Sequence, residues 1–307
     1  MRRRVTASCM CSVLLGAVVV AFAHTPQPSY AVANTWRLFD ATPGCVNAIR
    51  QVRIDAAGKA VVERTIARGR AGHALSVLDA RPRQVLFTDF DCRRNTSAVK
   101  LAVLGSSIKV TTIRRPSHQF FEGAFDSTGR AAYVGWDADG QVRVDRIALA
   151  TREVTASKSW TGLGFLDGLD TGAGRDVFLQ VSTGALSDHA ATRVMDWYGS
   201  QLSQYMIRRG KASMHMAVST RSVVGLATDE PPGRVYFKRW AGYPFSRAAI
   251  CGGDSPRSFT WLEHRVALAS CMTGSGSTRY EIVDLRGTAR KTVRLRGFWG
   301  IEPVGLG

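Results

Sequence analysis

Residues 84–90 read QVLFTDF, and the same kind of apolar stretch returns at four later points in the chain. The repeats are AAYVGWD at 131–137, DVFLQVS at 176–182, SVVGLAT at 222–228 and RVALASC at 265–271. They recur roughly every 45 residues, which is the period of a propeller blade. A polar loop and two more strand-like runs follow each repeat. The pattern predicts four-stranded blades in which the nearly continuous apolar run is a strand buried inside the ring.

The two ends of the chain together supply a sixth set of strands. NTWRLFD (34–40), VNAIRQVRID (46–55) and AVVERTIAR (60–68) match the second, third and fourth strands of a blade. The missing innermost strand is available at the other end, in IEPVGL (301–306). Closure by both termini leaves no open sheet edge. We therefore predict an all-β, six-bladed β-propeller closed by its N- and C-terminal strands, with a seven-bladed ring or a pair of β-sandwiches as alternatives.

The strand order and period resemble those of the secreted six-bladed propellers of bacteria, the TolB-like and WD40-like proteins. The resemblance covers nearly all of residues 34–307, but no WD dipeptide recurs at a fixed blade position. It implies a platform for binding a protein or another ligand. It transfers no site residue to this chain, because propellers carry many unrelated functions and each must be argued from its own site.

The first 33 residues are expected to be a signal peptide. Three arginines, Arg2–Arg4, precede an apolar run from Met10 to Ala23, and Ala31–Ala33 forms a small-x-small cleavage signature. We place cleavage after Ala33, with Ala21–Ala23 as a second candidate. A retained membrane anchor is the alternative, but the run of about 14 residues is shorter than the roughly 20 needed to span a bilayer. We expect export and a single secreted domain over residues 34–307.

Four cysteines remain after removal of the signal peptide, which favours two disulfides in an exported chain. By the strand register, Cys45 and Cys92 follow the second strands of neighbouring blades. Cys251 ends a fourth strand and Cys271 ends the second strand of the next blade. Because strands alternate in direction, all four thiols are expected on one face of the ring. This favours Cys45–Cys92 with Cys251–Cys271 over the two other pairings. No CxxC or CxxH spacing is present, so we expect no metal site.

The charge of the chain is strongly positive. Its formal net charge is +17, which becomes +14 when the three signal arginines are removed. Such a charge favours encounter with anionic wall polymers or acidic glycans, and nucleic acid also fits it. The alternative is that the arginines are scattered and only maintain solubility. The short clusters fall on the face predicted to carry the cysteines; the candidate ligand-binding residues there are Arg68, Arg70, Arg93, Arg94, Arg114, Arg115 and His118.

Two carboxylates are expected at the central channel. Glu122 and Asp167 each precede a glycine and lie nine residues before the second strands of the third and fourth blades. A pair of channel carboxylates is suited to holding a cation or to acid–base chemistry. The alternative is that they bind water or a neighbouring backbone amide.

These features favour a non-catalytic extracellular binding protein, a monomer without a cofactor, whose ligand is a protein or an anionic polymer of the cell envelope. The competing class is an extracellular hydrolase or lyase that uses the Glu122 and Asp167 side of the channel. A third is an envelope scaffold with no small ligand. No GxSxG nucleophile elbow supports the hydrolase.

Overall fold

The computed structural model of this protein describes most of the chain after the expected signal peptide, and the remaining segments are not described. The described residues are 35–42, 45–117, 119–174, 176–183, 191–198, 201–209, 214–219, 221–228, 234–238, 246–263, 266–275, 277–284, 290–293 and 304–305. Their regular secondary structure consists of β-strands in six four-stranded sheets, and the described part contains no helix. Accordingly, no helix among these residues meets the length and hydropathy needed to cross a membrane.

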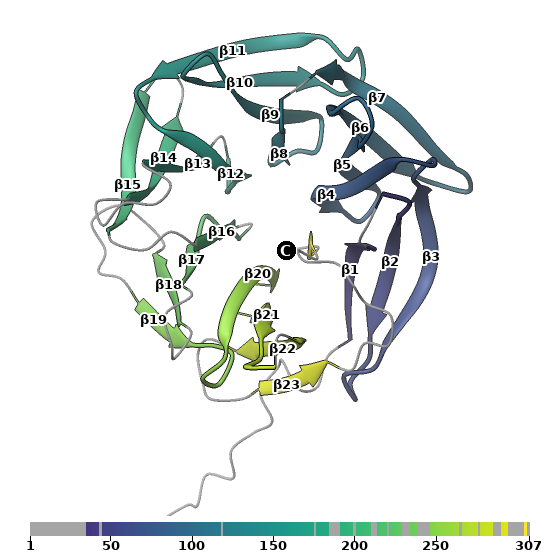
Figure 1. Cartoon of the computed structure of the whole chain (residues 1–307), viewed down its shortest axis with the longest axis vertical. Helices are drawn as coiled ribbons and strands as arrows, with labels where there is room; N and C mark the ends of the chain where they lie inside the picture. Colours follow the sequence, from purple (N-terminus) through teal and green to yellow (C-terminus); the bar gives the residue numbers. More distant parts are fainter. Residues whose placement is uncertain are drawn as a thin grey trace, which may run out of the picture.

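The six sheets are arranged around a central axis as the blades of a propeller (Figure 1). The strands of each blade are named from the innermost to the outermost. Blade 1 contains β24 (Val304–Gly305), β1 (Trp36–Ala41), β2 (Ala48–Ile54) and β3 (Ala60–Arg68). Blade 2 contains β4 (His73–Arg81), β5 (Gln84–Asp91), β6 (Thr96–Leu104) and β7 (Ile108–Ser117). Blade 3 contains β8 (Glu122–Phe125), β9 (Ala131–Ala138), β10 (Gln141–Ala148) and β11 (Val154–Thr161).

The second half of the ring follows the same order. Blade 4 contains β12 (Phe165–Thr171), β13 (Val177–Thr183), β14 (Ala191–Tyr198) and β15 (Gln201–Arg209). Blade 5 contains β16 (Met214–Val218), β17 (Val224–Thr228), β18 (Arg234–Lys238) and β19 (Ser246–Ala249). Blade 6 contains β20 (Ser255–Glu263), β21 (Val266–Met272), β22 (Thr278–Asp284) and β23 (Arg290–Val293). The six-bladed, all-β prediction is confirmed.

The ring closes through the two ends of the chain. Leu38 pairs with Gly305 and Phe39 pairs with Val304, so β24 is the innermost strand of a blade that otherwise comes from the N-terminal part. Figure 1 shows this C-terminal strand at the inner side of β1. The closing strand lies within the stretch 301–306 that the sequence pattern identified.

The hydrophobic core consists of layers between blades. Each of the six buried clusters in the described part of the chain combines side chains from two neighbouring blades. The cluster between blades 6 and 1 includes Trp36 and Leu38 together with Leu268 and Ile282. Gly225 allows one of these layers to pack closely, because a Cβ there would lie 2.6 Å from the ring of Phe259 in the next blade. Apolar second strands are thus explained by contact with blades on both sides.

Strand direction assigns every loop to one of two faces. All neighbouring strands within a blade are antiparallel. Loops that follow second and fourth strands therefore emerge on one face, and the turns that follow first and third strands emerge on the other. The face on which loops follow second and fourth strands carries Cys45, Cys92, Cys251 and Cys271. We call it the cysteine face.

Candidate functional site: the cysteine face of the ring

The Cys45–Cys92 disulfide joins the loops of blades 1 and 2, with its Cα atoms 6.5 Å apart. A third loop, from the end of β3 to the start of β4, is bound between them. In it, the Gly72 N–H donates to the Cys45 carbonyl (3.1 Å), and the Gly72 carbonyl accepts from the Cys92 N–H (2.8 Å). One covalent bond and two hydrogen bonds therefore fix three loops as a unit. The predicted pairing is confirmed here, and Cys251–Cys271 confirms it for the second bridge.

Four of the predicted basic residues lie on these three loops or at their edges. Arg68, Arg70, Arg93 and Arg94 are exposed. The Arg93 side chain covers Gly72, with Nε 3.2 Å from the position that a Cβ at Gly72 would take. Gly72 also has φ of 83°, so glycine is favoured at this position for both conformation and space. We call these four arginines the basic rim.

The basic rim retains most of its charge. Arg94 Nε is 3.9 Å from Asp91 Oδ2, a long contact for an 83% exposed side chain. Within the described part of the chain, no carboxylate forms an ion pair with Arg68, Arg70 or Arg93. Asp91 instead orders the loop, since its Oδ1 accepts from the backbone N–H of Arg93 (2.9 Å) and of Arg94 (3.1 Å). The Arg94 N–H contributes most to lowering the pKa of Asp91. The backbone of the loop is thus ordered by Asp91, and the arginines of the rim remain positively charged.

A polar network beneath the rim connects β4, β5 and β6. His73 Nδ1 lies 2.8 Å from Asp89 Oδ1, and the Lys100 ammonium donates to Asp89 Oδ2. Burial acts against ionisation of Asp89, but the hydrogen bonds from Lys100 and His73 outweigh it and lower its pKa. Asp89 was not expected, because one acid in an apolar strand does not reveal its partners on neighbouring strands.

Arg114 is engaged in a contact between blades. Arg114 donates to Asp145 Oδ2 at 2.6 Å and lies over the ring of Trp136, 4.4 Å from its centroid. It therefore attaches β7 of blade 2 to blade 3, and its charge is paired with that of Asp145. Arg115 is exposed on β7. His118 lies outside the described residues.

The predicted channel carboxylates occupy matching places at the cysteine-face end of the innermost strands. Glu122 begins β8, opposite Gly135. Asp167 lies at the bulge near the start of β12. Asp167 is exposed as a whole residue, but surrounding protein atoms partly remove its carboxyl group from water and so raise its pKa. A hydrogen bond from Ser182 opposes this rise. Asp137, at the end of β9, has its pKa raised by burial and by the charge of Asp167. The two aspartate side chains therefore interact electrostatically across the boundary of blades 3 and 4.

A second pair of carboxylates lies deeper, toward the opposite face. Asp79 Oδ2 accepts from the Phe125 N–H of the next blade, and Asp170 Oδ2 accepts from the Val218 N–H of the next blade, both at 2.6 Å. Each also accepts from the residue that follows it. Burial raises the pKa of Asp79 to about 6. Burial and the charge of Asp79 raise the pKa of Asp170 to about 8. These bonds connect adjacent blades along the channel.

Sequence reasoning missed this deeper pair. Its signal is the repeated Leu-Asp step at the end of the innermost strand, Leu78-Asp79 in blade 2 and Leu169-Asp170 in blade 4. Both oxygens of each carboxylate are engaged with backbone N–H groups. This arrangement serves blade-to-blade attachment.

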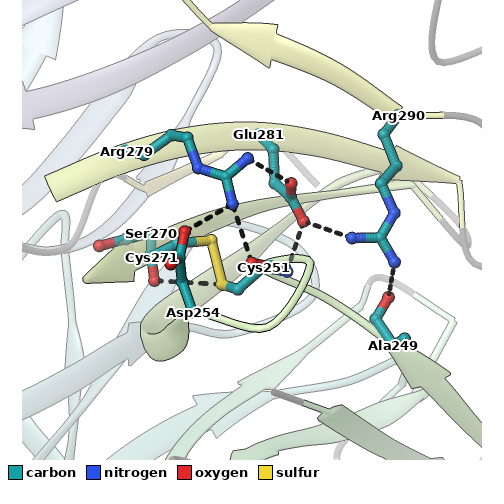
Figure 2. The surroundings of a disulfide bond; sticks show 8 residues. All are labelled: Ala249, Cys251, Asp254, Ser270, Cys271, Arg279, Glu281 and Arg290. Carbon is teal, nitrogen blue, oxygen red and sulfur yellow. Dashed lines mark hydrogen bonds and ion pairs between the residues drawn. A yellow bond between two sulfur atoms is a disulfide. The ribbon is translucent and has the colours of Figure 1, made fainter. Parts of the chain in front are cut away.

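The Cys251–Cys271 disulfide lies beside an ionic network centred on the buried Glu281 (Figure 2). The Glu281 carboxylate accepts from the Cys251 N–H at 2.5 Å and forms ion pairs with Arg279 and Arg290, both at 3.3 Å. Arg279 also donates to Asp254 at 2.8 Å. The Sγ atoms of Cys251 and Cys271 and one carboxylate oxygen of Glu281 lie within 4.8 Å of one another, as metal ligands do. The sulfurs are joined in the disulfide, so they are not thiolates, and this donor set does not fit a metal.

Comparison with known proteins gives a likeness of structure. No protein-family model matches the sequence, and no curated protein matches it either. Among solved structures, TolB from Acinetobacter baumannii has a TM-score of 0.64 at 12% identity, covering 88% of this chain and 65% of that one. A chain of the nidogen/laminin complex has a TM-score of 0.62 at 13% identity, covering 88% and 98%.

The β-propeller domain of the Trilobed protease from Pyrococcus furiosus has a TM-score of 0.53 at 11% identity, covering 86% of this chain and 85% of that one. Identities this low establish the fold alone. This chain spans somewhat less than two thirds of the TolB chain. The neighbours include a chain of a protein complex and a domain of a protease, so the fold by itself does not select a function. The chain thus has the six-bladed, TolB-like propeller architecture that its repeats indicated.

Proposed function

We propose that this protein is a secreted, non-catalytic binding protein whose basic rim takes an anionic ligand of the cell envelope. One observation carries the proposal: Arg68, Arg70 and Arg93 are exposed on two neighbouring loops that a disulfide and two backbone hydrogen bonds hold together, and none of them pairs with a described carboxylate. Unneutralised charges attract an anion, and the held loops reduce the cost of ordering the backbone when it binds.

The ligand class follows from the chemistry of the rim. Guanidinium groups bind phosphate and carboxylate oxygens through paired N–H donors. The arginines lie along a rim instead of around a closed pocket, so we propose a polymer with repeated phosphate or carboxylate groups. An envelope protein with an acidic surface is the other source of the same chemistry. Treating the envelope fraction with protease separates the two sources.

The test compares two sets of three substitutions. The rim variant carries R68S, R70S and R93S. The matched control carries R83S, K109S and R130S, which remove the same charge from exposed positions on the opposite face. Secreted protein is used to pull down polymers from cell-envelope fractions, with and without prior protease treatment.

We expect wild type and control to retain the polymer from protease-treated fractions, and the rim variant to lose it. Equal loss in both variants would reduce the interaction to diffuse charge attraction and contradict the rim. Retention that disappears after protease treatment would identify a protein ligand and contradict the polymer. Export itself is tested by N-terminal sequencing of the secreted chain, which should begin at Asn34.

A further inference from the structure

The blades next to the basic rim carry a repeated four-residue pattern at the channel mouth. Blade 3 has Phe120–Gly123, which reads FFEG, and blade 4 has Phe165–Gly168, which reads FLDG. Both copies lie at the same distance before their second strands. In each, the second residue points into the core: Phe121 packs edge-on against Trp136 with centroids 6.0 Å apart, and Leu166 packs on the cluster between blades 3 and 4. The first residue of each copy is thereby directed outward.

The outward rings are unusually exposed. Phe120 is 73% exposed and Phe165 is 58% exposed, the first and third largest values among the exposed large hydrophobic side chains of the described chain. Phe120 is held in place by stacking on Phe90, with ring centroids 5.8 Å apart. Exposed aromatic side chains that are already fixed are the typical anchors of protein interfaces.

Carboxylates accompany these rings. Asp167 is two residues after Phe165, and both oxygens of Asp137 accept from the Leu166 N–H at 3.0 and 3.1 Å. Neither aspartate has a cationic partner within the described residues. Burial raises the pKa of both aspartates, and the charge of Asp167 adds to the rise at Asp137, in a chain whose net charge is +17.

We infer that this channel mouth, formed by Phe120, Phe165, Asp137 and Asp167, is a docking surface for an extended, lysine- or arginine-bearing segment of a partner protein. Long cationic side chains satisfy both features of the surface. Their alkyl stems cover the phenylalanine rings and their charged heads reach the carboxylates. An anionic ligand is repelled here, and a neutral apolar one leaves the carboxylates without a partner. Two anchors in adjacent blades suit a polypeptide that spans both. The site differs from the basic rim in position and in the sign of its charge.

The probe is a fluorescein-labelled peptide of six Lys-Ala repeats, with its lysine-acetylated form as the uncharged counterpart. Binding is measured by fluorescence anisotropy with the full secreted protein. Two variants remove the proposed contacts, F120S/F165S and D167N. The matched control V110S/V154S removes two exposed apolar side chains from outer strands.

We expect wild type and V110S/V154S to bind the lysine peptide equally, and the acetylated peptide to bind at least about tenfold more weakly. Each contact variant should lower the affinity about fivefold or more. The rim variant should bind the peptide no less tightly, so failure here and failure of the proposed function are distinguishable. Absence of peptide binding by wild type would overturn the inference, as would equal losses in the contact and control variants. Unchanged melting temperatures verify that every variant is folded.

Discussion

The two disulfide regions use arginine in opposite ways. At Cys251–Cys271, both cysteines are buried, and Arg279 and Arg290 neutralise the buried Glu281. At Cys45–Cys92, Cys45 is exposed and the basic rim has a single, long ion pair in the described part of the chain. Partnered arginines stabilise the fold, whereas unpartnered arginines on a fixed frame remain available to a ligand. Net charge alone does not distinguish the two kinds of arginine and therefore does not identify the site.

The largest effect on stability is expected from a substitution in the ionic network around Glu281. E281A leaves the Cys251 N–H without its acceptor and removes the partner of two arginines. Because the buried Cys251 N–H loses a charged acceptor, while the partly exposed arginines stay hydrated, we expect a loss of about 3 kcal/mol in the free energy of unfolding. Urea denaturation measures it. R93A, at the other disulfide, should change the same quantity by less than about 0.5 kcal/mol. Similar losses in both variants would remove the distinction between the two regions.

Removal of the exposed disulfide should affect both stability and binding. C45S/C92S opens a crosslink between residues 47 apart in sequence and should lower the free energy of unfolding by about 2–3 kcal/mol. The double substitution also releases the loops that position Arg70 and Arg93. Affinity for polyphosphate, which serves as a model of the proposed anionic polymer, should therefore fall. C251S/C271S should destabilise the ring without weakening polyphosphate binding in the remaining folded protein. Unfolding curves and anisotropy titrations give the two quantities separately.

Asp170 extends the comparison to a partly buried carboxylate that accepts hydrogen bonds from backbone N–H groups. Its pKa of about 8 in the folded protein is above that of an unfolded aspartate, so the folded state binds the proton more tightly. The free energy of unfolding should therefore decrease as pH rises from about 4 toward 8. D170N cannot ionise and should show a smaller decrease. Urea curves at pH 5 and pH 8 test this, and an equal pH response in both proteins would contradict the assignment.

The sequence predicted what depends on the repeat. The blade register places all four cysteines on one face, and the same register pairs β24 with β1, so the disulfides and the closing strand follow from the residue pattern alone. The sequence did not predict the ion pairs and aromatic contacts that cross between blades. Arg114 appears in the sequence as one of a basic pair, and only the packing of blade 2 on blade 3 brings Asp145 and Trp136 to it.

The sequence also did not predict the direction of the side chains in the channel. Glu122 and Asp167 were found because each precedes a glycine at the same distance from a second strand. Asp79 and Asp170 share a Leu-Asp step, but that step does not show which groups they bind. Their partners are backbone N–H groups 46 and 48 residues away in sequence, and the packing of one blade on the next brings them together.

The salt dependence of polyphosphate binding tests the central claim most directly. Affinity of labelled polyphosphate is measured by anisotropy over a series of NaCl concentrations for wild type, the rim variant and the opposite-face control. If unpartnered rim arginines form the site, the plot of log affinity against log salt should be steep for wild type and the control. It should be clearly flatter for R68S/R70S/R93S, because fewer bound counterions are exchanged. Identical slopes for the rim and control variants would contradict the account.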